Sequence, residues 1–266
     1  MRLTSIKNTI KHNIRRFDKN YSEEYKIKKL PRFTQAEISF LGRRIRMADN
    51  ASFFFTRREL FDLQIYKFIS ATNSPYIIDC GANIGLSLIY FKELYPDAEI
   101  IAFEPDEKIF DILTYNIEVF NYSKIELNRK ACWSKETTLQ FFSEGADAGR
   151  AAQKFDKKNI TEVQTIRLRN FLNRKVDFLK MDIEGAEFEV LEDIKDLLPN
   201  VERIFVEYHS FSGQEQKLPE LLNILKTAGF RLNIHHQAAV HSPQPFVSIV
   251  EYYYMDLQLN IFGYRV

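Results

Sequence analysis

Short apolar runs alternate with amphipathic stretches along most of this chain, which predicts strands and helices in regular succession. Five runs have the length and composition of buried strands: 76–80, 99–103, 125–131, 178–181 and 203–208. Apolar residues recur at helical spacing in 85–95, 106–121, 186–197 and 216–228. This alternation predicts an α/β fold with a mostly parallel sheet and helices on both faces.

The C-terminal region has a different pattern. After the glycine turn at Gly229, segments 230–235 and 247–254 both look like strands, and no helical segment separates them. Residues 257–262 continue the alternation of apolar and polar positions. We therefore predict that an antiparallel strand pair closes the sheet.

The region before the first buried run predicts an extension of the core. Apolar residues flank Gly42 within 38–47, which predicts a hairpin. Residues 49–55 are interpreted as a loop with an aromatic cluster, and 59–70 as an amphipathic helix. We divide the chain into an N-terminal extension (1–30), a hairpin and helix (31–70), and the core domain (71–266).

Charge is unevenly distributed along the 266 residues. Residues 1–30 carry nine basic and three acidic side chains, a net charge of +6, so the remainder has a net charge of −5. Leu3, Ile6, Ile10, Ile14 and Phe17 recur at helical spacing within this segment, which predicts a basic amphipathic helix. Such a helix could contact an anionic membrane surface or an acidic partner, or pack on the domain with a solvated basic face.

Composition excludes several classes of protein. Apolar residues make up 45% of the chain, enough for a sizeable core, and no apolar run is long enough to cross a membrane. The N-terminus lacks the apolar core of a secretory signal, and Cys80 and Cys132 suggest neither a disulfide framework nor a zinc site. We expect a cytoplasmic protein, peripheral to the membrane if residues 1–30 bind lipid. The oligomeric state is left open.

A glycine loop follows the first buried strand. The sequence Asp79-Cys-Gly81-Ala-Asn83-Ile-Gly85 separates this strand from a helix, and Glu104 ends the next strand. This order is typical of a nucleoside-binding α/β domain in which the acid binds the ribose hydroxyls. Asn83 stands where a dinucleotide fingerprint has its middle glycine, so we favour a compact ligand with an amino-acid tail, whose ammonium could meet Asp79 or the loop carbonyls.

Three motifs together resemble the FkbM family of S-adenosylmethionine-dependent methyltransferases. They are Asp79–Gly85, Phe103-Glu-Pro-Asp106 and Phe178-Leu-Lys-Met-Asp-Ile-Glu-Gly-Ala-Glu187. The resemblance covers about residues 35–266 and implies a Rossmann-like, seven-stranded sheet that ends in an antiparallel pair. It also implies S-adenosylmethionine as the cofactor and O-methylation of a saccharide or similar polyol. The expected cofactor-binding residues are Asp79, Gly81, Asn83, Gly85, Glu104, Pro105, Asp106, Ala131, Trp133 and Asp182.

Methyl transfer to an alcohol requires alignment of the reactants and a base that removes the hydroxyl proton. His209 is the first candidate, because its ordinary pKa is near neutral, and Glu207 shares its strand face and could orient the imidazole. Asp182 follows the fourth strand and could contact the acceptor hydroxyl, act as the base or bind a metal. Asp182 and Glu207, with Glu184, could form a Mg²⁺ site, but three carboxylates are weak evidence and we favour a metal-free reaction.

Other side chains have ordinary structural explanations beside functional ones. Trp133 could stack on adenine or simply pack, and Lys180 is expected to pair with a carboxylate, because an unpaired buried ammonium is costly. Residues 53–55, 210–214 and 235–241 are expected to border the pocket of a small-molecule or glycan acceptor.

Two alternative functions remain. A methyltransferase for RNA or another nitrogen nucleophile is disfavoured by the acidic balance of residues 31–266, since nucleic-acid binding normally requires a basic face. A non-catalytic S-adenosylmethionine-binding module is disfavoured because the motif residues of a working enzyme are all present.

Overall fold

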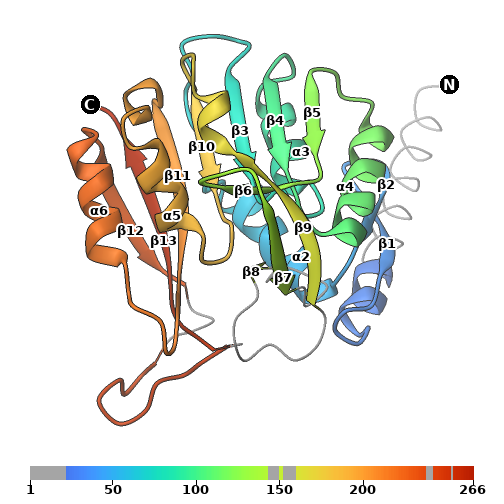
Figure 1. Cartoon of the computed structure of the whole chain (residues 1–266). Coiled ribbons are helices and arrows are strands. Elements are labelled where there is room, and N and C mark those ends of the chain that lie inside the picture. Colours follow the sequence, from blue (N-terminus) through green and yellow to red (C-terminus); the bar gives the residue numbers. More distant parts are fainter. Residues whose placement is uncertain (1–21, 143–149, 152–159, 238–241, 253) are drawn as a thin grey trace, which may run out of the picture.

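The computed structural model describes residues 22–142, 150–151, 160–237, 242–252 and 254–266. Its central sheet has seven strands in the order β12-β13-β11-β10-β3-β4-β5 (Figure 1). These strands are β3 (Tyr76–Cys80), β4 (Glu99–Phe103), β5 (Ile125–Asn128), β10 (Phe178–Met181), β11 (Arg203–Phe211), β12 (Arg231–His236) and β13 (Met255–Tyr264). Only β13 runs antiparallel to its neighbours, so the predicted Rossmann-like sheet with a terminal antiparallel pair is confirmed.

Helices cover both faces of this sheet, as predicted. They are α3 (Leu86–Leu94), α4 (Glu107–Phe120), α5 (Glu187–Ile194) and α6 (Leu218–Thr227). The apolar side chains of α3 and α4 share one core with the N-terminal region, and those of α5 and α6 form a second core on the opposite face. Asp106 explains where α4 begins, because its carboxylate accepts hydrogen bonds from the backbone amides of Lys108 and Ile109.

The N-terminal region consists of a hairpin and a helix. The hairpin, β1 (Ala36–Phe40) with β2 (Arg43–Met47), is confirmed, and α2 (Asn50–Arg57) continues into a π-helical turn, η1 (Arg58–Asp62). The predicted loop over 49–55 and helix over 59–70 are therefore wrong. Asp49 caps α2 through a 2.9 Å hydrogen bond from the Ser52 amide, and Gln64, with φ 55°, lies beyond the helical segment.

A four-stranded sheet, which the apolar pattern did not reveal, occupies much of the segment between β5 and β10. Its order is β6-β9-β7-β8, from β6 (Ala131–Trp133), β7 (Thr138–Phe142), β8 (Arg150–Ala151) and β9 (Ile160–Arg167). A 3-10 turn, η2 (Leu168–Phe171), follows β9, and a second, η3 (Leu198–Asn200), follows α5. The predicted strand over 125–131 ends at Asn128 because β6 pairs with β9 instead of β4.

The predicted strand over 247–254 is also wrong. The last strand begins at Met255, after Tyr254, which has a φ of 65° that an extended strand cannot continue through. Val247 is 80% exposed, so this apolar run does not contribute to the sheet. Residues 255–264 form the strand instead because nine of them pair with β11, for example Asn260 opposite Glu207, and six of these nine also pair with β12.

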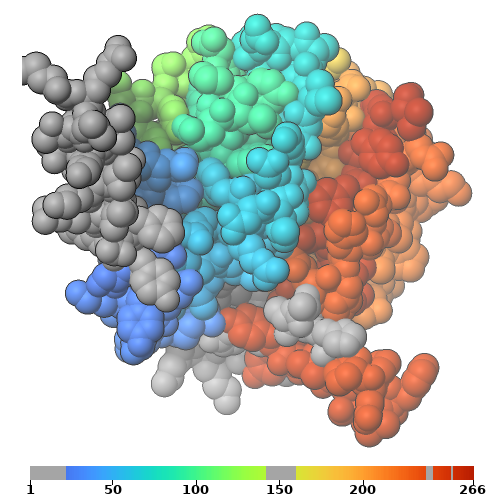
Figure 2. Space-filling model, turned by 180° about the vertical axis from the view of Figure 1, so that it is seen from behind, coloured from blue at the N-terminus to red at the C-terminus, as the bar shows by residue number. Residues whose placement is uncertain are grey.

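The predicted basic helix of residues 1–30 lies mostly outside the described residues. Residues 22–28 are helical, and Glu24 binds Arg57 of α2 at 2.7 Å. Figure 2 shows the blue N-terminal hairpin lying against the cyan and green segments of the core. Within the described ranges, no helix has the length and apolar character needed to cross a membrane.

Candidate active site

The sheet order reverses between β3 and β10, and the ends of these two strands meet there. Gly81, after β3, has a φ of 90°, and a Cβ built on it would lie 1.8 Å from the Asp182 carbonyl oxygen, after β10. A glycine is therefore required for the two chains to pass this closely. In open α/β sheets this reversal is where ligands bind.

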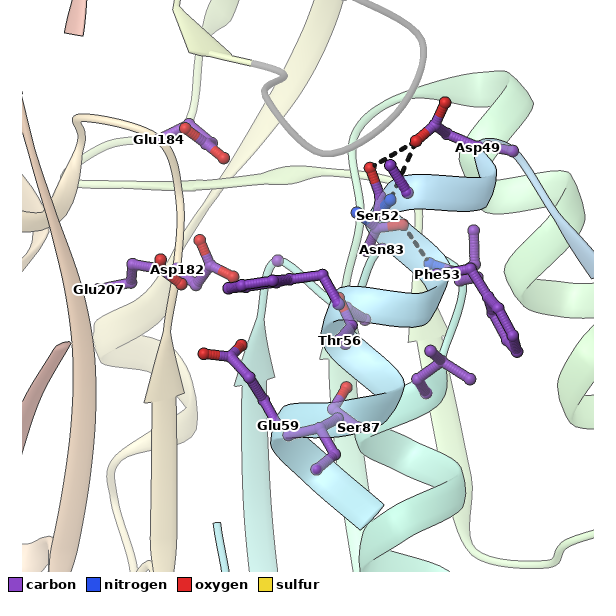
Figure 3. Close-up of a pocket in the computed structure, with 18 of the residues that line it drawn as sticks. Asp49, Ser52, Phe53, Thr56, Glu59, Asn83, Ser87, Asp182, Glu184 and Glu207 are labelled. Carbon is purple, nitrogen blue, oxygen red and sulfur yellow. Dashed lines mark hydrogen bonds between the residues drawn. The ribbon is translucent and has the colours of Figure 1, made fainter. Parts of the chain in front are cut away.

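A pocket of about 390 Å³ opens beside this crossing (Figure 3). Three parts of the chain form most of its walls: the glycine loop with the start of α3, the α2–η1 segment, and the ends of β10 and β11 with their neighbours near β13. Arg32 adds a basic side chain to the lining. Five carboxylate side chains contribute to the lining: Asp49, Glu59, Asp182, Glu184 and Glu207. Its size is in the range of small-molecule sites.

A buried lysine joins the two strand ends. Lys180 Nζ lies 3.2 Å from Asp79 Oδ1 and 3.3 Å from Asp182 Oδ2, and donates a hydrogen bond to the Gly81 carbonyl at 2.6 Å. Burial lowers the pKa of Lys180, but the two carboxylates outweigh it and raise this pKa above its ordinary value. Asp79 has no exposed surface and accepts a further hydrogen bond from Ser87 Oγ at 2.5 Å. The predicted pairing of Lys180 with a carboxylate is confirmed.

Glu104 holds the glycine loop from the other side. Its carboxylate accepts hydrogen bonds from the amides of Asn83 at 3.0 Å and Asp106 at 2.9 Å. Burial raises the pKa of Glu104 to about 7, because the hydrogen bonds only partly offset the loss of solvent. Asn83 adopts a φ of 48°, which asparagine tolerates better than most residues, and it lines the pocket.

His209 is enclosed by carboxylates. Its Nδ1 lies 2.9 Å from Glu187 Oε1 and its Nε2 lies 3.4 Å from Glu184 Oε2, and the side chain is 1% exposed. Burial lowers the pKa of His209, but Glu184 and Glu187 outweigh it and raise this pKa well above its ordinary value. The two carboxylates thus favour the protonated imidazole, which makes His209 poorly suited to accept a proton.

Glu207 is the carboxylate of β11 that faces the pocket. Its Oε1 accepts a hydrogen bond from Gln258 Nε2 of β13. The side chains of Glu207 and His209 both lie close to Asp182, which confirms the prediction that they share one face of the strand. Burial, followed by the negative charge of Asp182, raises the pKa of Glu207 to about 8. Glu207 can thus exchange a proton near neutral pH.

The same residues include a potential metal-ligand set. One ligand atom each from Asp182, Glu207 and His209 lies within 4.8 Å of the others. Two cationic groups are already close to this set, because Lys180 pairs with Asp182, and His209 is itself charged. A divalent cation would have to displace or neutralise them.

The family model of the methyltransferase FkbM domain matches residues 79–232, more than half of the chain. The chain belongs to the FkbM methyltransferase family. It is an enzyme of a fold that uses S-adenosylmethionine, and the matched segment contains the glycine loop, Lys180, Asp182 and the β11 carboxylate described above.

Among its relatives is methyltransferase sdnD of Sordaria araneosa, 27% identical over 73% of this chain and 88% of that protein. Another is 2-O-methyltransferase NoeI of Sinorhizobium fredii, 24% identical over 54% of this chain and 68% of that protein. A solved FkbM methyltransferase from Methylobacillus flagellatus superposes with a TM-score of 0.47 at 18% identity, over 73% of this chain and 45% of that one.

The structure divides the predicted site residues of this FkbM methyltransferase into two groups. Gly81, Asn83, Asp182 and Glu207 line the pocket. Asp79, Gly85, Glu104, Pro105, Asp106, Ala131, Trp133 and His209 do not. Trp133, in β6, packs partly buried against the core of α5 and α6.

Sequence reasoning missed part of two walls of the pocket. The missed residues are Ser52, Thr56 and Glu59 of the α2–η1 segment and Gln258 of β13. Of the three segments expected to border the acceptor, 53–55 contributes Phe53 and Phe55 to the lining, and 235–241 contributes Gln237 among its described residues. Asp49 is a typical N-cap residue, so the sequence contained a signal for the start of α2. With that signal, Ser52 and Thr56 could have been assigned to one helix.

Proposed function

We propose that this chain is an S-adenosylmethionine-dependent O-methyltransferase that acts on a hydroxyl group of a saccharide or similar polyol. The observation that carries the proposal is the pocket where the glycine loop and a proton-accepting carboxylate, Glu207, face the same space. One wall would hold the methyl donor, and the other would receive the acceptor hydroxyl.

The donor is proposed to bind across the ends of β3 and β4. Its methionine end would lie on the glycine loop near Asn83 and Asp182, which line the pocket. Its ribose would bind Glu104, whose two oxygens each already accept one backbone hydrogen bond and retain a further lone pair. Pro105, Asp106, Ala131 and Trp133 would border the adenosine side. Because Asp79 is enclosed, its role is to fix Ser87 and Lys180 beneath the loop rather than to touch the donor.

The acceptor oxygen is proposed to lose its proton to Glu207 while it attacks the methyl group in line with the departing sulfur. Asp182 would orient the same hydroxyl. His209 acts on Glu207 through its charge, because its ring nitrogens face Glu187 and Glu184, and its Nε2 also lies 3.4 Å from Gln258 Nε2, which donates a hydrogen bond to Glu207. Deprotonation of Glu207 then leaves it next to two cations, Lys180 and His209, which stabilise the charged form.

A hydroxylated acceptor fits the lining better than a nucleic acid. The pocket offers hydrogen-bond acceptors on Glu59, Asp182 and Glu207, and its aromatic side chains include Phe55 and Tyr252. The relative NoeI is named a 2-O-methyltransferase, which supports oxygen as the atom that is methylated. Phosphate groups would be repelled by the carboxylates.

Two measurements test this proposal in sequence. Isothermal titration should detect S-adenosylmethionine binding, and the absence of binding would refute every form of the proposal. Screening neutral sugars for S-adenosylhomocysteine release should then find a substrate, and Glu207→Gln should lower turnover roughly 10² to 10⁴-fold while donor binding persists. We expect EDTA to leave turnover unchanged; loss that Mg²⁺ restores would assign Asp182, Glu207 and His209 to a metal.

A further inference from the structure

The pocket contains a carboxylate that the proposed reaction does not use. Glu59 comes from η1, about 150 residues before Glu207 in the chain, and lies on the opposite wall (Figure 3). In the close-up its carboxylate points toward the side where Asp182 and Glu207 lie. We propose that Glu59 binds the acceptor, and that Glu59 and Glu207 together select acceptors with neutral or cationic donor groups over acceptors with an anionic group.

The local fold directs Glu59 inward. The Leu63 amide bonds to the Arg58 carbonyl at 2.9 Å, five residues earlier, so η1 is a π-helical turn. Directly after Glu59 the turn is anchored by apolar contacts, because Leu60 is buried and the ring of Phe61 packs edge-on against Phe40 with centroids 4.9 Å apart. Single π-helical turns within α-helices are often found at functional sites.

Charge pairing distinguishes Glu59 and Glu207 from the other carboxylates of the pocket. Asp49 pairs with Arg32 at 2.8 Å, Asp182 pairs with Lys180, and Glu184 faces His209. Within the described part of the chain, neither Glu59 nor Glu207 has a basic group within 4.0 Å. Each accepts one hydrogen bond from a neutral amide instead, Glu59 from Gln237 at 3.1 Å and Glu207 from Gln258.

Glu59 and Glu207 are half-buried carboxylates with no cation in direct contact among the described residues, and Lys180 and His209 act on Glu207 from further away. Loss of solvent makes their charge costly, and a ligand that donates hydrogen bonds relieves that cost. S-adenosylmethionine carries one net positive charge from its sulfonium, ammonium and carboxylate groups, which balances only one of the two. Burial and the charge of Asp182 raise the pKa of Glu59, and the hydrogen bond from Gln237 and the charge of Arg58 offset this rise only in part. An acceptor hydroxyl or ammonium between the two walls would complete the site, whereas an acceptor carboxylate there would be repelled.

This inference rests on the proposed function and is tested with methyl glycosides of glucose, galactose and mannose. Each is used in its neutral form, its 2-amino form and its uronic acid form, and kcat and KM are measured from S-adenosylhomocysteine release. We expect wild type to use the neutral or amino form and to reject the uronic acid. Glu59→Gln retains an oxygen that can accept the hydrogen bond from Gln237. The variant therefore removes the charge and keeps the hydrogen bond that joins the two walls of the pocket.

For Glu59→Gln we expect a KM about tenfold or more above wild type with the amino and neutral forms, and a smaller preference against the uronic acid. Donor affinity measured by titration should stay unchanged. Asp62→Asn is the matched control, because it removes one negative charge from the same turn at an exposed position outside the pocket lining. Gln237→Ala removes this hydrogen bond but keeps the charge of Glu59. It should leave unchanged the order in which the enzyme prefers the neutral, amino and uronic acid forms.

Different failures have different consequences. If Glu59→Gln keeps the KM values and preference of wild type, or if wild type uses the uronic acid as well as the neutral sugar, Glu59 has no part in acceptor selection. If wild type binds the donor but methylates no member of the panel, both the saccharide class and this inference fail. If the donor itself does not bind, the proposed function fails first.

Discussion

Asp79 and Glu207 are both acids of the central sheet, but their surroundings differ in a way that separates the two halves of the site. Asp79 is enclosed and is matched by Lys180 and Ser87, whereas Glu207 lines the pocket and, within the described residues, its side chain accepts a hydrogen bond only from the amide of Gln258. The half built on β3 and β10 is thus electrostatically complete before any ligand binds. The half built on β11 and η1 has two carboxylates, Glu59 and Glu207, that no described cation contacts directly and that a ligand can satisfy.

This difference predicts how each half responds to substitution. Changes in the completed half should damage folding and donor binding together, because its groups hold one another in place. Changes in the acceptor half should alter turnover and acceptor choice with little loss of stability, and removal of an unmatched charge there can even be stabilising.

Gly81→Ala should have the largest effect. The added Cβ would lie 1.8 Å from a backbone oxygen, which cannot move as a side chain can, and the residue has a φ of 90°. We expect loss of measurable donor binding by titration and a strongly lowered Tm. Gly213→Ala is the matched control, because Gly213 has a similar φ of 83° but nothing within 4 Å of the added Cβ. Equal effects in both variants would mean that backbone strain, and not the crossing of β3 and β10, is responsible.

Lys180→Met should rank second. It leaves Asp79 and Asp182 without their cation, and breaking a buried ion pair by removal of one partner costs about 3–5 kcal/mol. Chemical denaturation should report this loss in the free energy of unfolding, and donor affinity should fall as the loop loses its hydrogen bond from Lys180. Lys175→Met removes a lysine that is 62% exposed and pairs with Glu202, so it should cost at most about 1 kcal/mol. A small effect of Lys180→Met would contradict the electrostatic completeness of this half.

The completed half is also the half that could be predicted from the sequence. Its residues lie in contiguous motifs, and the strand ends that carry Asp79, Gly81, Glu104 and Asp182 follow directly from the apolar pattern. The acceptor half joins residues such as Glu59, Glu207 and Gln237, which meet only because the α2–η1 segment packs across the ends of the sheet. The π-helical turn that aims Glu59 depends on tertiary packing rather than on a local sequence signal, so it could not be predicted.

His209 shows a second limit of prediction from sequence. The prediction that His209 is a base used its ordinary pKa, but the pKa of a buried imidazole depends on its neighbours. Glu187 reaches it from the start of α5, and Glu184, with a φ of 55°, reaches it from the preceding turn. Neither approach can be predicted from the alternation of residues along β11.

The pH dependence of stability tests the unmatched half. The pKa of Glu207 rises from an ordinary value of 4.5 to about 8 on folding. The native protein therefore binds the proton more tightly than the unfolded chain, and stability is lost as pH rises from about 4.5 to about 8. At about 1.4 kcal/mol per pKa unit, the loss amounts to a few kcal/mol.

Glu207→Gln should remove this loss, so its Tm should exceed that of wild type at pH 9 and match it near pH 4.5. Thermal unfolding across this range measures both curves. Glu215→Gln, at a position 73% exposed just after β11, should follow the wild-type curve. Parallel curves for wild type and Glu207→Gln would show that folding does not raise the pKa of Glu207.

Substitution of Asp106 should have the smallest effect on stability. It also tests whether Asp106 contacts the donor or only caps α4. Its carboxylate caps α4 through the amides of Lys108 and Ile109, and loss of such a cap costs about 1 kcal/mol. We expect Asp106→Ala to lower the free energy of unfolding by that amount, whereas Asp106→Asn, which also caps helices, should stay close to wild type. Donor titration separates capping from direct binding. Equal losses of donor affinity in both variants would mean that the charge of Asp106 contacts the donor. Loss in the alanine variant alone would mean that the cap positions Glu104 and the glycine loop.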